Sequence, residues 1–180
     1  MELTIPADDK QLETVLDFIH KLLPSDCETD LLYKIDVAAE EIFVNIAHYA
    51  YKDKLPAGVS GQVWITCTYE NELLTMIFRD KGVPFDPLAR PDPDITLSAE
   101  ERSIGGLGIF LTKKYMDSVE YCYENEENIL TMKKMIFRCH YAQGYSIVSI
   151  LSIPVATSTC LQNEDGCLII ILPPVGSMSL

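Results

Sequence analysis

The chain has 180 residues, of which 48% are hydrophobic and 23% are charged, so it is long enough for one domain with a sizeable core. A net charge of −13 argues against nucleic acid as a direct partner, because nucleic-acid phosphates would be repelled. We see no basic-then-apolar leader and no apolar run of roughly 20 residues, so we expect a cytoplasmic protein that does not bind membranes.

The N-terminal part of the chain predicts a short strand followed by two helices. Leu3–Ile5 alternates and is ended by Pro6, after which apolar residues recur at helical spacing as far as Leu23. A longer helix is expected from about Glu28 to Tyr51, since its apolar residues fall on one side of the helical wheel. These residues are Leu32, Ile35, Ala39, Ile42, Phe43 and Ile46.

Glu41 and Asn45 lie four residues apart on this longer helix, beside its apolar side. An amide oxygen can ligate a hard cation and a carboxylate can accept a proton, so the pair suits a polar cleft. On this helix alone, two solvated polar side chains remain the simpler interpretation.

The middle of the chain predicts a β-hairpin followed by a long irregular segment. Val63–Tyr69 and Leu73–Arg79 have strand patterns and are joined by a short polar link. The second strand continues into Asp80-Lys81-Gly82, a sequence that is most often a turn. Leu88–Ser103 shows no sustained period and is interpreted as a lid that is mobile without ligand.

A glycine-rich sequence, Gly105-Gly106-Leu107-Gly108, then opens a third helix that ends near Met116. It is either a flexible hinge at the end of the lid or a cradle in which backbone N–H groups hold phosphate. Two further strands, Ser118–Tyr123 and Ile129–Lys134, complete the pattern.

Each motif is weak by itself, but their ordered combination resembles the GHKL (Bergerat-fold) ATPases. Within that superfamily it is most similar to the RsbW-like anti-sigma-factor serine kinases. Three segments carry the resemblance and look like the N, G1 and G2 boxes of that group. They are EIFVNIAHYAY from Glu41, DKGVPFDP from Asp80 and GGLGIFLTKKYMD from Gly105.

The resemblance implies an α/β (α+β) two-layer sandwich, with helices on one face of a mixed, mostly antiparallel sheet. It covers about residues 1–134, which we take as the ATPase/kinase domain, and leaves residues 135–180 as a C-terminal extension of unknown role.

The resemblance also implies ATP and Mg²⁺ as cofactors and a role for each matching residue. Asn45 would ligate Mg²⁺, and Glu41 would be the general base toward the attacking hydroxyl group. Asp80 would accept a hydrogen bond from the adenine amino group, and Gly82 would leave room for the ring. The residues expected to hold the phosphates are Gly105, Gly106, Leu107 and Gly108, and Thr131 is matched to a last-strand threonine near adenine.

The activity that follows from the resemblance is an ATP-dependent serine/threonine protein kinase that acts as an anti-sigma factor. Its partners would be a STAS-domain anti-sigma-factor antagonist and a sigma factor, and the chain would form a homodimer. The alternative is a non-catalytic ATP-binding switch, which would have no need of a base at Glu41. A histidine-kinase core is disfavoured, because the first helix carries only His20 and no separate phosphoacceptor hairpin precedes the N box.

The C-terminal part differs in composition from the rest of the chain. From Arg138 it is almost uncharged and rich in Ser, Cys and Ile, with possible strands at Ser146–Ile153 and Cys167–Leu172. The six cysteines and three histidines show no metal-ligand spacing, so we expect reduced thiols and no zinc site.

Overall fold

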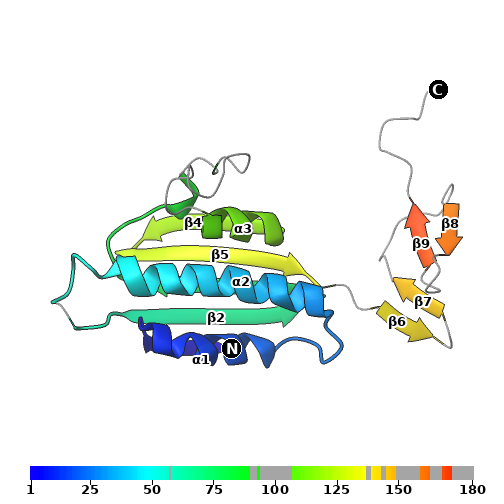
Figure 1. Cartoon of the computed structure of the whole chain (residues 1–180), viewed down its shortest axis with the longest axis horizontal. Coiled ribbons are helices and arrows are strands. Elements are labelled where there is room, and N and C mark those ends of the chain that lie inside the picture. Colours follow the sequence, from blue (N-terminus) through cyan, green and yellow to red (C-terminus); the bar gives the residue numbers. More distant parts are fainter. Residues whose placement is uncertain are drawn as a thin grey trace, which may run out of the picture. The chain divides into compact units, whose positions relative to one another are not determined.

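The secondary structure of the first 136 residues follows the predicted order (Figure 1). The computed structural model describes residues 1–56, 58–89, 93 and 107–136, together with four short strands between residues 139 and 171. The strands of the main sheet are β1 (Glu2–Pro6), β2 (Gln62–Glu70), β3 (Leu73–Asp80), β4 (Ser118–Glu124) and β5 (Glu127–Met135). The helices are α1 (Leu12–His20), α2 (Thr29–Asn45) and α3 (Leu107–Tyr115), with short helical turns η1 (Asp9–Gln11), η2 (Ile46–Ala50) and η3 (Pro87–Ala89).

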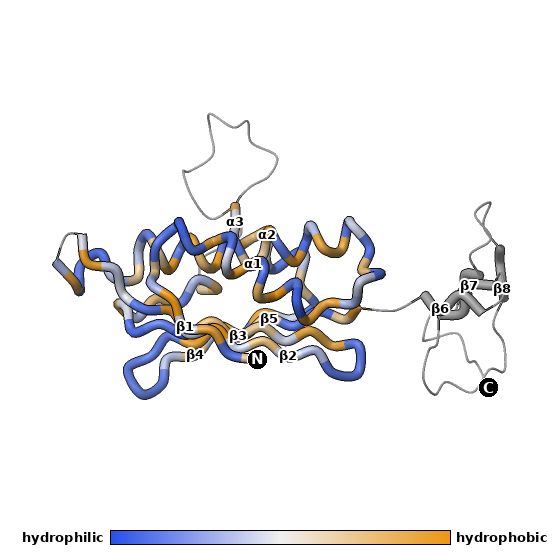
Figure 2. Tube along the Cα trace, turned by 90° about the horizontal axis from the view of Figure 1, so that it is seen from below, coloured by the Kyte–Doolittle hydropathy of each residue, from blue (hydrophilic) through white to orange (hydrophobic). Residues whose placement is uncertain are grey.

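The sheet has five strands in the order β1-β2-β3-β5-β4, and each neighbouring pair is antiparallel. All three α-helices lie on one face of it, as Figure 2 shows from the side. The predicted two-layer sandwich is therefore confirmed, with a sheet that is antiparallel in every pairing rather than mixed.

Both hairpins of the five-stranded sheet turn on two residues with positive φ. These are Asn71 (51°) and Glu72 (62°) between β2 and β3, and Asn125 (53°) and Glu126 (63°) between β4 and β5. Positive φ at both central positions suits a two-residue hairpin loop, because its twist matches that of the strands. Asn tolerates this conformation best after Gly, and it stands first in both turns.

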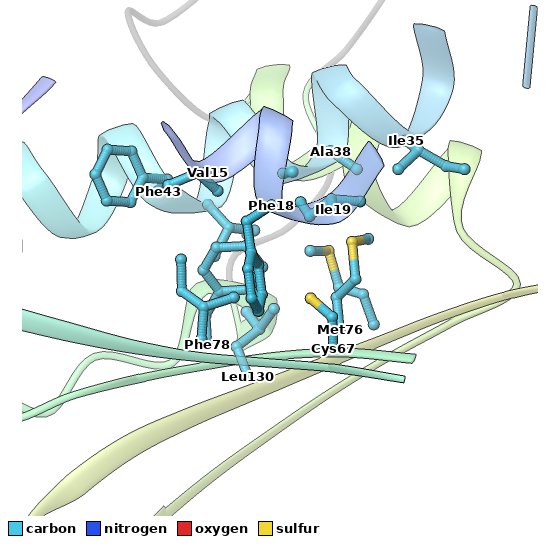
Figure 3. Close-up of a cluster of buried hydrophobic side chains, with 14 of the residues drawn as sticks. Val15, Phe18, Ile19, Ile35, Ala38, Phe43, Cys67, Met76, Phe78 and Leu130 are labelled. Carbon is cyan, nitrogen blue, oxygen red and sulfur yellow. The ribbon is translucent and has the colours of Figure 1, made fainter. Parts of the chain in front are cut away.

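The core lies between the helices and the inner face of the sheet (Figure 3). On β3 every second side chain is buried, including Met76 and Phe78, and these pack with Ile35 and Phe43 of α2. The same alternation makes Asp80 the last inward-facing residue of the strand. A carboxylate is thereby placed at the end of a row of core side chains.

The second helix differs from its prediction at the C-terminal end. The sequence predicts one helix to about Tyr51, whereas α-helical geometry stops at Asn45 and a π-helical turn, η2, continues to Ala50. The carbonyl oxygen of Ala50 accepts a hydrogen bond from the Val83 N–H (2.7 Å), which ties this turn to the segment after β3. π-Helical turns often occur at functional sites because they widen the helix locally.

The chain divides into two compact units, Met1–Ile136 and Phe137–Leu180. Ile136 is buried in the first unit and its N–H donates to the Glu72 carbonyl (2.7 Å), so this unit extends two residues past the predicted Lys134. In the second unit the described strands form two antiparallel pairs: β6 (Cys139–Ala142) with β7 (Tyr145–Val148), and β8 (Thr159–Gln162) with β9 (Leu168–Ile171). Across the described segments, the helices are too short or too polar to span a bilayer.

Candidate functional site

A cavity of about 740 Å³ lies between α2 and α3 and is also lined by residues of β3, β4 and β5. This volume is within the range of small-molecule and nucleotide sites. The polar side chains around it come from α2, η2, β3, α3, β4 and β5, and from the segment that follows η2. They include Glu41, Asn45, Tyr49, Lys52, Asp53, Asp80, Lys113, Tyr121 and Asn128, while Leu107 and Gly108 line it from the start of α3.

Glu41 and Asn45 project into this cavity from successive turns of α2. Both are partly buried, and neither side chain has a hydrogen-bond or ion-pair partner in the described part of the chain. Burial, with a smaller contribution from neighbouring Glu40, raises the pKa of the Glu41 carboxyl group above its ordinary value. A carboxylate with a raised pKa and an amide without a partner are both available to a ligand.

Gly108 is in contact with the Glu41 carboxylate. A Cβ atom at position 108 would lie 1.7 Å from Glu41 Oε2 and 2.2 Å from its Cδ, so no other residue fits without moving Glu41. The predicted phosphate-binding role of this glycine stays a prediction. The structure adds a second reason for a glycine at position 108: without a side chain there, the start of α3 can pack directly against Glu41.

Asp80 is only 4% exposed and uses one carboxylate oxygen for two hydrogen bonds within the chain. Its Oδ1 accepts from the Gly82 N–H (2.8 Å) and from Asn128 Nδ2 (2.9 Å), whereas Oδ2 has no partner among the described residues. Burial raises the pKa of Asp80, and the two hydrogen bonds and the positive charge of Lys54 partly oppose this shift. Asp80 lines the cavity, so it offers a ligand one acceptor oxygen, Oδ2, on a carboxylate held by two hydrogen bonds to Oδ1.

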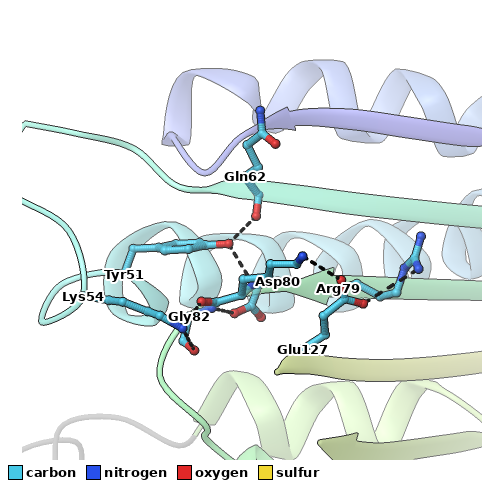
Figure 4. Close-up of polar contacts among 8 residues, drawn as sticks. Tyr51, Lys54, Gln62, Arg79, Asp80, Gly82 and Glu127 are labelled. Carbon is cyan, nitrogen blue, oxygen red and sulfur yellow. Dashed lines mark hydrogen bonds and ion pairs between the residues drawn. The ribbon is translucent and has the colours of Figure 1, made fainter. Parts of the chain in front are cut away.

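The segment after Asp80 is held by two side chains from beyond η2 (Figure 4). The Tyr51 hydroxyl donates to the Gln62 carbonyl (2.5 Å) and accepts from the Lys81 N–H (2.9 Å). The Lys54 ammonium donates to the carbonyl of Lys81 (2.6 Å) and to that of Gly82 (3.3 Å). These contacts fix the turn that orients the Asp80 carboxylate.

Gly82 is buried but does not line the cavity, because it packs against η2 instead. A Cβ atom there would lie 2.3 Å from the Ala50 carbonyl oxygen, which is backbone and cannot swing away. The expected clearance for an adenine ring stays a prediction, and the contact with η2 is what this structure shows.

Replacing Gly82 with alanine should lower the free energy of unfolding by about 1–3 kcal/mol, the usual cost of overpacking at a site that cannot yield. Denaturant unfolding of the ligand-free protein measures this loss without any contribution from nucleotide. An unchanged unfolding midpoint in Gly82→Ala would mean that the contact with Ala50 is looser than described.

Asn128 is a cavity residue that the sequence does not indicate, because it lies just before the last predicted strand, Ile129–Lys134. It stands directly opposite Asp80 in the β3–β5 pairing. This pairing joins residues 48 apart in the chain, so the sequence held no local signal for the contact.

Thr131, by contrast, is not brought to the cavity. On β5 the buried side chains are Asn128, Leu130 and Met132, so Thr131 points to the face of the sheet without helices. Its predicted position near adenine therefore has no support from the geometry.

Gly105 and Gly106 lie outside the described residues, as does nearly all of the predicted lid, Leu88–Ser103. The described residues at the rim of the cavity include four large apolar side chains that are 43–64% exposed. They are Tyr49, Val83, Phe85 and Leu107.

The family profile described as the histidine kinase-like ATPase domain matches residues 5–134. The chain is similar to the anti-sigma F factor of Bacillus subtilis, with 26% identity over 106 residues, which are 59% of this chain and 68% of that protein. It is also similar to the serine-protein kinase RsbW of Listeria monocytogenes, with 28% identity over 103 residues, covering 55% of this chain and 63% of that protein.

A solved structure of the RsbU and RsbW domains of a Mycobacterium tuberculosis protein is similar at 12% identity and a TM-score of 0.49. That match covers 76% of this chain and 32% of the other. The family profile spans well over half of the sequence, so the chain belongs to the histidine kinase-like (GHKL) ATPase family, with distant homology to RsbW and anti-sigma F factor kinases.

Proposed function

We propose that this chain is an ATP-dependent serine/threonine protein kinase that phosphorylates a STAS-domain anti-sigma-factor antagonist and sequesters a sigma factor. Membership of the family implies ATP binding. The two relatives are named as an anti-sigma factor and a serine-protein kinase. Their names support the kinase and anti-sigma-factor parts of the proposal, although both proteins are only distantly similar. The observation that carries it is the pair Glu41 and Asn45, which line the cavity without partners in the described residues.

The side chains present fit a nucleotide with its cation. Mg²⁺ usually takes one or two protein ligands and completes its shell with water and phosphate oxygens, so a single unpaired amide such as Asn45 is sufficient. Asp80 Oδ2 is an acceptor without a partner in the described chain, which suits an exocyclic amino group. Lys52 and Lys113 add positive charge to the lining of an otherwise acidic protein.

When Mg·ATP is bound, the ATP would supply the phosphoryl group and the Mg²⁺ would partly neutralise the negative charge of the phosphates. The chain's own contribution is mainly to position and polarise. The Asn45 amide oxygen would hold the cation from one turn of α2, and the Glu41 carboxylate on the preceding turn would accept the proton of the attacking hydroxyl group. Asp80 would orient the base of the nucleotide by accepting a hydrogen bond from its amino group.

The test is incubation of the full chain with γ-labelled ATP, Mg²⁺ and candidate STAS proteins encoded near its gene. Label on a serine or threonine of one of these proteins is the expected result. ATP binding without transfer to any STAS partner would instead support the non-catalytic switch, in which nucleotide only changes affinity for a partner.

Replacing Asp80 with asparagine should weaken ADP binding by roughly 1–3 kcal/mol, as expected for a mismatched buried polar contact. The asparagine oxygen can keep both hydrogen bonds of Oδ1, from Gly82 and Asn128, which leaves an NH₂ group in place of Oδ2. Two donors, the amide and the adenine amine, would then face each other. Calorimetry measures the loss, with the exposed Asp17→Asn on α1 as a charge-matched control. Equal ADP affinity in both variants would rule out Asp80 as the adenine contact.

A further inference from the structure

Asn128 is 6% exposed and uses its full hydrogen-bonding capacity inside the protein. Its Nδ2 donates to Asp80 Oδ1 (2.9 Å) and to the Val83 carbonyl (3.2 Å). Its Oδ1 accepts from the Tyr121 hydroxyl (2.7 Å) and from the Phe85 N–H (3.2 Å). A side-chain amide has two donor hydrogens and two acceptor lone pairs, so every one of them is used.

These four contacts determine which way the amide faces. With the amide turned over, its oxygen would face the Asp80 carboxylate and the Val83 carbonyl, and its NH₂ group would face the Phe85 N–H. Acceptors would then meet acceptors and a donor would meet a donor. The backbone of the segment after β3 therefore holds the NH₂ group of Asn128 toward Asp80.

The orientation of Asn128 in turn determines which oxygen of Asp80 is available. Oδ1 takes two hydrogen bonds, from Asn128 and Gly82, and is thereby fixed against rotation about the terminal torsion. The other oxygen, Oδ2, has no partner among the described residues, and the Asp80 side chain lines the cavity. The available group is thus a single acceptor in a fixed direction.

We propose that Asn128 is the positioning residue for nucleobase specificity, which it sets by fixing Asp80 so that only an acceptor oxygen meets the base. The proposal rests on the proposed function in one respect, that adenine nucleotides enter this cavity. A 6-aminopurine presents an N–H donor to Oδ2. A 6-oxopurine presents an oxygen instead, and this contact is unfavourable because both atoms are acceptors. A site built to hydrogen-bond one partner rejects an analogue that leaves its buried group unpaired.

The experiment compares ADP with IDP, which differ at purine position 6, by calorimetry on the full chain. The wild type should bind ADP more tightly than IDP. In Asn128→Asp, two adjacent buried carboxyl groups would share a proton, because like charges in one site disfavour double ionisation. The carboxyl pair can then donate to the oxygen of IDP, so the ratio of ADP to IDP affinity should fall by ~10-fold or more.

Two further variants separate this effect from a general loss of structure. Asn128→Ser removes the donor to Asp80 without adding charge, so it too should lower the ADP to IDP ratio. It also serves as the test if Asn128→Asp does not fold in the absence of ligand. Ile129→Val, on the next residue of β5 and the opposite face of the sheet, should keep the wild-type ratio.

A folded Asn128→Ser or Asn128→Asp protein that loses affinity for ADP and IDP equally would overturn the proposal, because Asn128 would then act only on stability. Equal ADP and IDP affinity in the wild type would also overturn it. Failure of the wild type to bind either nucleotide would instead defeat the proposed function on which it rests.

Discussion

Replacing Glu41 with glutamine is expected to lower the rate of phosphoryl transfer by ~10²–10⁴, the usual worth of a positioned general base. Glutamine keeps the shape of the side chain against Gly108 and keeps hydrogen-bonding groups at its end, but it cannot accept the proton. ATP affinity should barely change, since the carboxylate is assigned no part in ground-state binding. Single-turnover transfer from labelled ATP, with binding measured in parallel, tests both statements.

The pH dependence of transfer provides a second check on Glu41. Its pKa is raised by burial, so the basic form is lost when the pH falls through that raised value, at a higher pH than for an exposed glutamate. The wild-type transfer rate should therefore fall as the pH drops through this pKa, and the residual rate of Glu41→Gln should not show this fall. Burial in the folded protein disfavours the ionised Glu41 carboxylate. Replacing it with neutral glutamine should therefore not lower the free energy of unfolding of the ligand-free protein at neutral pH.

The neighbouring Glu40 offers a matched control for this variant, because it has the same charge but is exposed on α2. Glu40→Gln should keep the transfer rate within a few-fold of wild type. If Glu41→Gln transfers phosphate as fast as Glu40→Gln, then Glu41 is not the base.

Replacing Asn45 with alanine should damage both binding and transfer, because it removes a ligand of the cation and not a proton acceptor. Mg·ATP affinity should fall by ~10-fold or more, while nucleotide affinity measured with the metal chelated should change little. The variant loses no hydrogen bond within the described part of the chain, so its fold should survive. Equal losses of affinity with and without Mg²⁺ would show that Asn45 contacts the nucleotide and not the cation.

Glu41 and Asn45 should therefore differ in kind. The first variant changes the rate with binding intact, and the second changes metal-dependent binding itself. A pair of variants with the same profile would mean that the two side chains act as one structural unit.

Most of the fold could be predicted from the sequence because its signals are local. The alternation of β3, the apolar side of α2 and the short polar link between β2 and β3 each depend on neighbouring residues, and each prediction is confirmed within a few positions. The end of the second helix was predicted less well. Residues 46–50 keep a helical apolar pattern, and their π-helical geometry is accompanied by a contact between Ala50 and Val83 that no short window of sequence contains.

The candidate site could be predicted in part, for the same reason. Glu41 and Asn45 share a helix side, and Asp80 ends a strand. The family resemblance carried by these ordered motifs brought the three into one expected site, and the structure places all three around one cavity. Asn128 could not be found in this way, because its partner Asp80 lies on a strand reached only through the β3–β5 register. Side chains on a strand alternate between its two faces, so Thr131 lies on the opposite face of β5 from Asn128 and points away from the cavity.

We propose that the cavity between α2 and α3 is a magnesium-dependent adenine-nucleotide site. Calorimetric titration of the full chain with a non-hydrolysable ATP analogue, in Mg²⁺ and again in chelator, tests it most directly. We expect one nucleotide bound per chain, with affinity that falls when the metal is removed and falls again in Asp80→Asn. Absence of binding in Mg²⁺, or binding that neither the chelator nor Asp80→Asn weakens, would contradict it.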